Sequence, residues 1–236
     1  MPNERPSLSI LMPAYNEEPG LESAVLECLE TCRKAGLVFE FIIVNDCSKD
    51  RTGEIANRLA ENHPEVRVCH HEVNKGAGAG IRTGLQAAGM EYLIFIPVDN
   101  PLSPEDLAPY LPHLGQADII AGIREQRVGY PLLARVGSFI YSRILIPLLF
   151  RLRVKDPNWI QVYRRSIFSE QGIRIDYDGM FFPVAILIQA QRKGLVIVSV
   201  PARMKLRLHG KATCFRFTAV WKAFKDMMDF YRAAPR

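Results

Sequence analysis

Three apolar runs in the first hundred residues each end at a cluster of acidic and amide side chains. The runs and the residues that follow them are 8–12 before Pro13-Ala14-Tyr15-Asn16-Glu17, 41–44 before Asn45-Asp46, and 93–98 before Asp99-Asn100. In an open α/β sheet, ligands bind in the crevice outside the carboxyl ends of the parallel strands. The pattern therefore predicts a sheet that gathers carboxylates at one edge, around one pocket.

Strand and helix patterns alternate through the first half of the chain. Strands are predicted at 8–12, 39–45, 66–71, 92–97 and 118–121, and helices at 20–35, 52–62, 78–88 and 104–114. This rhythm is typical of an α/β fold with a mostly parallel sheet flanked by helices. The second half adds strands at 159–163 and 195–200 and helices at 139–153, 179–193 and 217–232, the first and last of them amphipathic.

Charge divides the chain into two unlike halves, although its 236 residues suit one domain with its own core. Residues 1–123 hold 9 Lys and Arg against 18 Asp and Glu, a net charge of −9, whereas residues 124–236 hold 21 against 7, a net charge of +14. An acidic half suits a cation or a base and ribose, and a basic half suits phosphates, an anionic lipid surface or nucleic acid. Nucleic acid is the weakest of these readings, because the basic half carries no known recognition module.

Other features narrow the class of protein. The best candidate for a membrane span, 139–152, is interrupted by Arg143 and Arg151, so it falls short of the roughly 18 apolar residues that a span needs. Residues 1–7 do not have the apolar centre of a secretory signal. The five cysteines have neither metal-site spacing nor the pattern of a disulfide framework. We expect a cytoplasmic protein with free thiols that is not an integral membrane protein.

Two segments favour a nucleotide pocket. Residues 13–18 lie between a strand and a helix whose first turn exposes N–H groups, although an ordinary strand-to-helix turn explains them as well. Residues 45–52 carry more acceptors and hydroxyls than a turn requires, which favours a contact between Asp46 and a base or ribose. In the same segment we interpret Asp50 and Thr52 as cap and turn residues.

The glycine-rich run 74–80 resembles a dinucleotide fingerprint only superficially. It follows the third predicted strand instead of the first, and Ile81 stands where the last glycine of G-x-G-x-x-G belongs. We interpret it as a tight helix start that allows close packing, with Lys75 within reach of a phosphate.

Asp99 ends a strand so apolar that its charge needs a partner. A divalent cation that bridges a diphosphate is one interpretation, and a cap for the following helix is the other. Arg207 and Lys211 flank a glycine in a way that suits a phosphate. Asp156 and Asp178 are interpreted either as general bases or as partners of arginines.

Together these residues resemble the family 2 glycosyltransferases, most closely the dolichol-phosphate mannose synthases and related polyprenyl-phosphate glycosyltransferases. Four segments carry the resemblance: Pro13-Ala14-Tyr15-Asn16-Glu17, residues 45–52, Asn74-Lys75-Gly76-Ala77-Gly78, and Val200-Pro201 with Arg207-Leu208-His209-Gly210-Lys211. They are similar to the family's nucleotide-binding turn, its acidic D-D-G-S-x-D-x-T segment, its N-x-G-K-G helix start and its late phosphate-facing element.

The resemblance implies an A-type glycosyltransferase fold, a nucleotide diphosphate sugar as donor (GDP-mannose or a UDP-sugar), and one glycosyltransferase domain over 1–236. Residues 1–123 would bind the donor and 124–236 the acceptor. The implied donor contacts are Pro13, Ala14, Tyr15, Glu17, Asn45, Asp46, Lys75 and Gly76. Asp99, Arg207 and Lys211 would be catalytic, and Arg124, Arg135 and Ser138 would bind the acceptor. Asp99 would hold Mg²⁺ or Mn²⁺, although Pro97 stands where the family has its first metal aspartate.

The implied reaction is an inverting transfer of a sugar to a polyprenyl or dolichyl phosphate at a membrane surface. The protein would then be peripheral on the cytoplasmic face of an anionic membrane, with its amphipathic helices in contact with lipid. Packing of those helices on the sheet, or on a second copy of the chain, is an equal alternative. Two other functions stay open. One is a soluble glycosyltransferase with a hydroxyl acceptor, and the other is a nucleotide-sugar-binding protein with impaired turnover.

Overall fold

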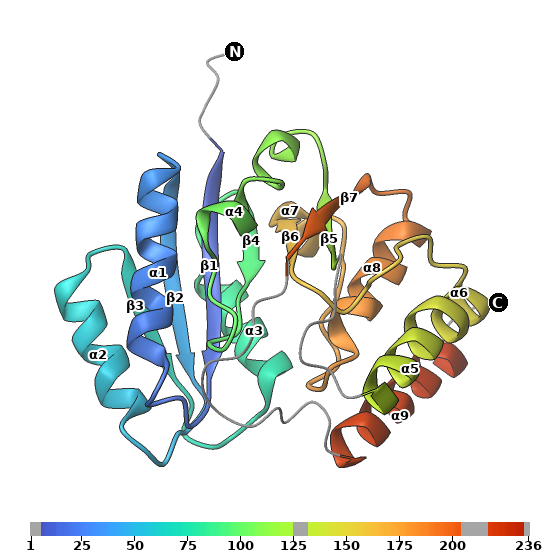
Figure 1. Cartoon of the computed structure of the whole chain (residues 1–236), viewed down its shortest axis with the longest axis horizontal. Helices are drawn as coiled ribbons and strands as arrows, with labels where there is room; N and C mark the ends of the chain where they lie inside the picture. Colours follow the sequence, from blue (N-terminus) through green and yellow to red (C-terminus); the bar gives the residue numbers. More distant parts are fainter. Residues whose placement is uncertain (1–5, 125–131, 204–216, 234–236) are drawn as a thin grey trace.

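The computed structural model describes residues 6–124, 132–203 and 217–233. Strands alternate with helices through the first half of the chain, as predicted (Figure 1). The elements are β1 (Ser7–Ala14), α1 (Leu21–Lys34), β2 (Val38–Asn45), α2 (Thr52–Asn62), β3 (Val66–His70), α3 (Ala77–Ala87), β4 (Tyr92–Phe95), α4 (Pro104–Leu107), the 3₁₀ turn η1 (Leu111–His113) and β5 (Ile119–Arg124).

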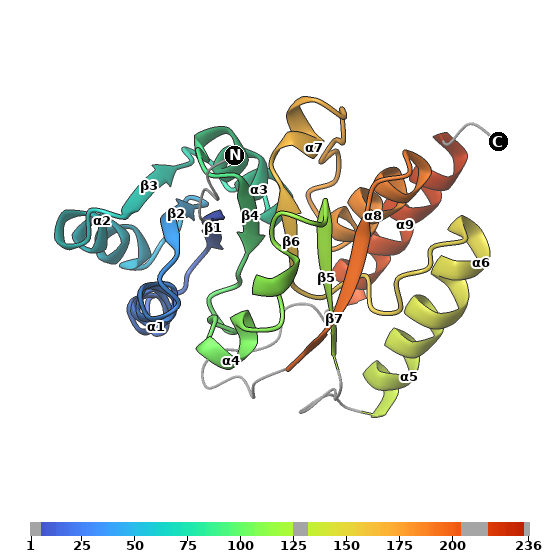
Figure 2. The same cartoon turned by 90° about the horizontal axis from the view of Figure 1, so that it is seen from above.

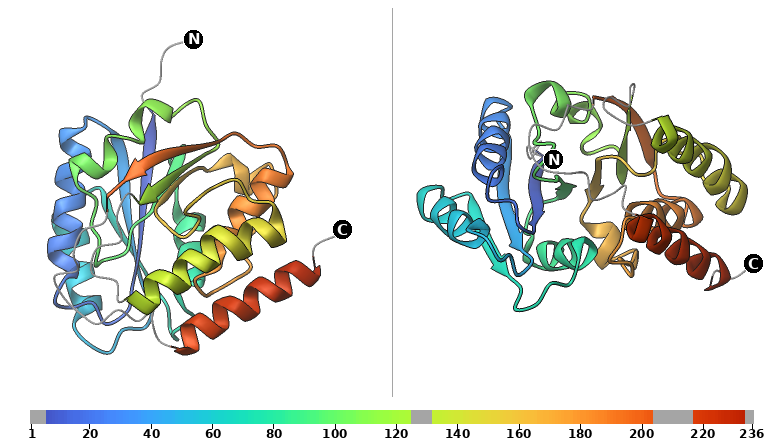
Figure 3. Two further views of the ribbon diagram at one scale, coloured as in Figure 1. Left: turned by 45° about the vertical axis from the view of Figure 1, so that its right-hand side comes forward. Right: turned by 60° about the horizontal axis from the view of Figure 1, so that its bottom comes forward.

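The second half contributes two strands and a set of helices packed beside the sheet. They are α5 (Leu132–Ile140), the π-helical turn η2 (Tyr141–Leu145), α6 (Ile146–Phe150), β6 (Gln161–Arg164), α7 (Ser166–Ser169), α8 (Phe182–Arg192), β7 (Ile197–Ala202) and α9 (Phe217–Ala233). The segment formed by α5, η2 and α6 runs as one long helix beside α9 (Figure 3). The rings of Phe150 and Phe230, with centroids 5.7 Å apart, join the two.

The described strands form one sheet in the order β3-β2-β1-β4-β6-β5-β7. Only β6 runs antiparallel to its neighbours, β4 and β5, and the other pairs are parallel. The prediction of an α/β fold with a mostly parallel sheet is therefore confirmed. Because the parallel strands share one direction, the residues that follow β1, β2, β4, β5 and β7 meet at the same edge, together with those that precede β6.

Alternating side chains of the strands supply two apolar layers. Ile10 and Met12 belong to the core that includes α1, while Leu11 belongs to the core on the other face, which α3 helps to form. This period of two is expected for a strand buried on both faces. Seen from above, α1, α2 and α4 lie on one face of the sheet and α3, α7 and α8 on the other (Figure 2). A third cluster joins α8, α6 and α9 to the sheet.

Two predicted helices have different limits. The predicted helix at 104–114 is wrong, since α4 ends at Leu107 and only a 3₁₀ turn follows. Pro109 and Pro112 have no N–H to donate to a helical hydrogen bond, which explains the break. The predicted helix at 139–153 begins earlier, at Leu132, and ends at Phe150, where Arg151 takes a left-handed φ of 54°.

Candidate functional site

The loops that follow β1 and β2 are bonded to each other at the shared edge. The Asn16 backbone N–H donates to the Ser48 hydroxyl at 3.0 Å, and the Lys49 N–H donates to Asn16 Oδ1 at 2.8 Å. The Glu17 N–H donates to Thr52 Oγ1 at 2.8 Å. Asn16 has a φ of 55°, a left-handed conformation that asparagine tolerates better than most residues. The two loops, residues 15–20 after β1 and residues 46–51 after β2, therefore form one unit, called the double loop below.

Asp50 holds this double loop from within. Its carboxylate accepts hydrogen bonds from the Thr52 N–H at 3.0 Å and from the Glu18 N–H at 3.1 Å. Burial acts to raise the pKa of the Asp50 carboxyl, but these bonds and the one from the Thr52 hydroxyl outweigh it, so the pKa is lowered. The interpretation of Asp50 and Thr52 as turn residues is confirmed, but neither is the N-cap of α2, which is Arg51.

Asp46 joins the double loop to the start of α3. Its buried carboxylate accepts hydrogen bonds from the backbone N–H groups of Lys75 and Gly76, both at 2.8 Å. His71 Nδ1 lies 2.7 Å from Asp46 Oδ1, and His71 Nε2 lies 2.8 Å from Thr83 Oγ1. The direct contact between Asp46 and a base or ribose stays a prediction. What the structure adds is that Asp46 also positions the backbone around Lys75.

The sequence analysis assigned no role at the site to His71, which directly follows His70. The two rings do point to opposite faces, as the alternation along a strand requires. The His70 ring contacts Asn45 Nδ2 at 3.0 Å and Asn57 Oδ1 at 2.9 Å. Only the pairing of β2 with β3, which no local pattern shows, places His71 beside Asp46.

The glycines of the run 74–80 serve close packing, as predicted. Gly76 has a φ of 89°, and a Cβ atom on Gly78 would lie 2.1 Å from the Tyr177 carbonyl oxygen. The Gly78 N–H donates to the Asp178 carbonyl oxygen at 3.2 Å. On the next turn of α3, Arg82 donates to the Asp178 carboxylate at 2.6 Å. Of the two interpretations of Asp178, the structure confirms the arginine partner.

The other predicted donor residues surround this unit. Tyr15 is 45% exposed, Glu17 is half-buried, and the Lys75 side chain is exposed. Ala14 is buried, and its carbonyl oxygen accepts the Asp46 N–H at 2.9 Å. Pro13 packs so closely that a Cβ atom on Gly80 would lie 3.0 Å from Pro13 Cβ.

Asn45 stabilises the loop that follows it. Its Oδ1 accepts the Ser48 N–H at 3.2 Å, and the side chain is buried. The predicted donor residues thus lie together at the ends of β1 and β2 and the start of α3. Their contact with a donor stays a prediction.

Asp99 lies at the same edge, after β4, which is the neighbour of β1 in the sheet. Its side chain is half-buried, between the exposed Pro97 and the buried Asn100. Within the described parts of the chain, no three His, Cys, Asp or Glu side chains gather closely enough to hold a metal ion. Mg²⁺ is commonly held by only one or two carboxylates together with substrate phosphates. Asp99 therefore fits a cation shared with a diphosphate, not one enclosed by protein ligands.

A buried ion pair lies at the end of β5, on the basic side of the edge. Arg124 Nε and Nη2 each donate to the Asp156 carboxylate at 2.7 Å, and both side chains are 4% exposed. The Arg124 guanidinium also lies 4.6 Å from the centre of the Trp159 ring. Asp156, like Asp178, is thus an arginine partner.

The other predicted acceptor residues lie on α5. The Arg135 side chain is exposed, and Ser138 is half-buried, with its carbonyl oxygen accepting the Ser142 hydroxyl at 2.7 Å. Whether Arg124, Arg135 and Ser138 contact an acceptor stays a prediction. Arg207 and Lys211 lie outside the described residues.

The paired helices carry many exposed apolar side chains. Those on α5, η2 and α6 are Val136, Phe139, Ile140, Ile144 and Leu148, and those on α9 are Trp221, Phe224 and Tyr231. Among the described residues, none of the helices combines the length and the apolar character that crossing a bilayer requires.

Curated relatives match most of this chain. Glycosyltransferase AglD of Haloferax volcanii is 27% identical over 203 residues, which cover 82% of this chain and 32% of that protein. The undecaprenyl-phosphate 4-deoxy-4-formamido-L-arabinose transferase of Pectobacterium atrosepticum is 29% identical, over 75% of this chain and 54% of that protein. The dolichol-phosphate mannosyltransferase of Pyrococcus furiosus is 26% identical, over 87% and 58%. The chain thus spans about a third to somewhat more than half of these relatives.

Solved structures share the fold. The glucosyl-3-phosphoglycerate synthase of Mycobacterium tuberculosis, in complex with Mn²⁺, uridine diphosphate and phosphoglyceric acid, superposes with a TM-score of 0.71 at 19% identity, covering 99% of this chain and 80% of that one. S. aureus TarS 1–349 in complex with UDP-GlcNAc gives a TM-score of 0.62 at 17% identity, covering 95% and 65%. The expected A-type glycosyltransferase fold is confirmed.

A family model also matches the chain. It is described as Glycosyl transferase family 2, and it covers residues 9–172, from β1 to the end of the turn after α7. The match includes the double loop, Asp46, the start of α3 and Asp99. The chain belongs to glycosyl transferase family 2.

Proposed function

We propose that this chain transfers a sugar from a nucleotide diphosphate sugar, GDP-mannose or a UDP-sugar, to a polyprenyl or dolichyl phosphate at a membrane surface. The observation that carries the proposal is the shared sheet edge, where the double loop, the start of α3 and Asp99 lie on neighbouring strands. The family match and the relatives named for undecaprenyl phosphate and dolichol phosphate support it.

The proposed reaction is a single displacement at the anomeric carbon. An oxygen of the acceptor phosphate forms the new bond to this carbon, and the bond to the donor diphosphate breaks on the opposite side. The bonding electrons leave with the nucleotide diphosphate, so the configuration is inverted. A lipid phosphate is ionised near neutral pH, and the reaction therefore needs no strong general base.

The state of the two candidate bases supports a phosphate acceptor over a hydroxyl. Asp156 is held by Arg124 within a buried ion pair, and Asp178 is held by Arg82. Both oxygens of Asp156 accept hydrogen bonds from the Arg124 guanidinium, and Asp178 accepts one from Arg82, so these carboxylates are already engaged by arginines. The transfer then depends on positioning and on stabilisation of the leaving charge.

In this proposal each residue of the edge has a task. The double loop and Asp46 seat the base and ribose, and the Lys75 ammonium faces the phosphates. Asp99 would hold Mg²⁺ or Mn²⁺, which neutralises charge on the leaving diphosphate when it is bound. Arg207 and Lys211 bind phosphate oxygens of the donor or the acceptor, and Arg124, Arg135 and Ser138 lie on the acceptor side.

Thermal-shift titration with GDP-, UDP-, dTDP- and CDP-sugars, each with and without Mn²⁺, tests the proposal. We expect one nucleotide class to raise the melting temperature, and its apparent affinity to fall about tenfold or more without the cation. Asp99→Asn should remove the effect of the cation, while Glu61→Gln, an exposed acid on α2, should keep it. Absence of stabilisation by every donor would contradict the proposal.

A further inference from the structure

The order of strands gives the bound donor a direction along the edge. The double loop and Asp46 follow β1 and β2, Asp99 follows β4, and β6, β5 and β7 lie beyond β4. A donor whose nucleoside lies at the double loop and whose diphosphate lies at Asp99 therefore points its sugar toward β6 and β7. This step rests on the proposed function.

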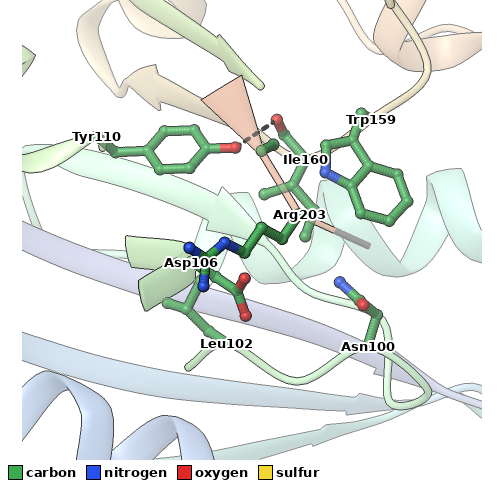
Figure 4. A pocket seen from close by; sticks show the side chains of 8 residues that line it. Asn100, Leu102, Asp106, Tyr110, Trp159, Ile160 and Arg203 are labelled. Carbon is green, nitrogen blue, oxygen red and sulfur yellow. Dashed lines mark hydrogen bonds between the residues drawn. The ribbon is translucent and has the colours of Figure 1, made fainter. Parts of the chain in front are cut away.

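A small pocket, open to solvent and with room for about one water molecule, lies at that place. It is lined by Asn100, Leu102, Asp106, Tyr110, Trp159, Ile160, Ala202 and Arg203 (Figure 4). Asn100 is the residue next to Asp99, Trp159 and Ile160 immediately precede β6, and Arg203 immediately follows β7. The Tyr110 hydroxyl closes one wall by donating to the Ile160 carbonyl oxygen at 3.2 Å.

Trp159 is held in place from one side. The Arg124 guanidinium lies 4.6 Å from the centre of its ring, and the bidentate bonds to the buried Asp156 fix that guanidinium in turn. A cation above an indole is attracted by the face of the ring. The half-buried ring is thus a rigid wall of the pocket, and its N–H is turned toward Ile160 and Arg203 (Figure 4).

The lining combines apolar surface with both signs of charge. Trp159, Leu102 and Ala202 are apolar, Arg203 and the Asn100 amide offer donors, and the Asp106 carboxylate offers an acceptor. Asp106 Oδ2 accepts the Ser103 hydroxyl at 2.6 Å, which fixes the carboxylate at the start of α4. A sugar ring needs both donors and acceptors around its hydroxyls and apolar surface against its C–H groups. A bare phosphate suits this lining less well, because Asp106 repels it.

We propose that Trp159 is a specificity-determining residue, whose indole packs against the glycosyl group of the donor at the mouth of this pocket, with Asn100 and Arg203 hydrogen-bonding the sugar hydroxyls. The pocket selects among sugars that share one nucleotide, and contributes nothing to the binding of the free nucleoside diphosphate.

Calorimetry with two ligands tests the proposal: the preferred nucleotide sugar and the matching nucleoside diphosphate without a sugar. Trp159→Ala should weaken nucleotide-sugar binding by about tenfold or more and change nucleoside-diphosphate binding by less than about twofold. Trp159→Phe, which keeps a ring, should recover part of the loss. Arg203→Gln alters an exposed side chain and leaves the core intact, and it should weaken only the nucleotide sugar, whereas Lys193→Gln at the end of α8 should weaken neither.

The outcomes separate this inference from the proposed function. Wild-type protein that binds nucleotide sugars, with the Trp159 and Arg203 variants binding both ligands as the wild type does, would overturn the pocket and leave the proposed function standing. Equal weakening of both ligands would also overturn it, because the residues would then act on the nucleotide. Wild-type protein that binds no nucleotide sugar would overturn both proposals.

Discussion

At the scale of single residues, three buried polar atoms in the second half of the chain reduce the stability of the fold. Tyr141 Oη, Asn158 Oδ1 and Asp226 Oδ2 are buried without a hydrogen-bond partner among the described residues. They come from η2, the segment before β6 and α9. Asp226 also lies against the backbone before α8, since a Cβ atom on Gly179 would lie 3.0 Å from Asp226 Oδ2. Buried acceptors without donors cost stability.

The environment of Asp226 favours its protonated form. Burial is the main cause of the raised pKa of this carboxyl, and Asp229 and Asp178 raise it further, while Lys222 and Lys225 act in the opposite direction. Burial raises the pKa of Tyr141 on η2 and of Tyr177 before α8, and the nearby Asp226 charge raises both further. When Asp226 is protonated, its carboxyl O–H can donate a hydrogen bond to a neighbouring acceptor that otherwise has no donor.

We predict that Asp226→Asn is more stable than the wild type at neutral pH, and that the difference grows as the pH rises from acid to neutral. Because the folded-state pKa of Asp226 is raised, the folded protein holds this proton more tightly than the unfolded chain. Stability is therefore greatest below the ordinary pKa of aspartate and falls as the pH rises through the folded-state value. The variant should lose this fall and melt a few degrees above the wild type at neutral pH. Differential scanning fluorimetry from about pH 4 to 8 measures it.

Glu170→Gln, at the residue that follows α7, is the control, because Glu170 is an exposed acid on another element. Its melting curve should follow that of the wild type across the whole pH range. If the melting temperatures of Asp226→Asn and the wild type change with pH in the same way, the Asp226 carboxyl has no pH-dependent effect on stability and the prediction is wrong.

The residues at the site were predicted from the sequence with unequal success. Asp50 and Thr52 as turn residues and the glycines of the run 74–80 behave as predicted, because their roles depend on local turn geometry and close packing. The roles of His71 and of the Arg124–Asp156 pair depend on contacts between distant strands. No local pattern encodes such contacts, so the sequence left Asp156 and Asp178 open and overlooked His71.

At the scale of elements, the α5–η2–α6 helix and α9 form an amphipathic pair at one side of the molecule (Figure 3). Phe150 packs against both Phe230 and Tyr231 on the inner side. Leu148 is 74% exposed and Trp221 is 60% exposed, on helices that also carry the exposed Arg135 and Arg143. Apolar side chains beside arginines are the combination that binds the interface of an anionic membrane.

We predict that this helix pair binds anionic vesicles. Wild-type protein should sediment with phosphatidylglycerol vesicles at low salt and bind less at high salt, because salt screens the arginines. Leu148→Glu should reduce the bound fraction about tenfold, since it places a charge on the apolar surface. Val196→Glu, at an exposed apolar position outside the helix pair, should bind like the wild type. Wild-type protein that stays in solution at low salt would contradict the membrane contact.

Elements were predicted well where hydrophobic period and length agree. The strands and helices of residues 8–88 occur nearly where the periodicity placed them. The helix at 104–114 failed because two prolines interrupt an otherwise helical pattern, and the start of α5 was missed at residues 132–138. That β6 runs antiparallel between β4 and β5 was not predictable, because strand pairing is settled by the tertiary structure.

At the scale of the whole molecule, the acidic half (residues 1–123) and the basic half (residues 124–236) both contribute to one sheet (Figure 1). Both also contribute residues to the edge at which the candidate site lies. The acidic half supplies the double loop and Asp99, and the basic half supplies Arg124, Trp159 and Arg203. In the proposed function, a donor with a diphosphate crosses the boundary between the acidic and the basic half. The central claim is therefore spatial: the donor extends along the edge from β2 toward β7.

A crystal structure of the protein with its preferred nucleotide sugar tests this claim most directly. The account predicts electron density for the base and ribose at the double loop and Asp46, for the diphosphate at Asp99, and for the sugar beside Trp159. Density for the nucleotide on any other surface, or a sugar directed away from β6 and β7, would contradict it.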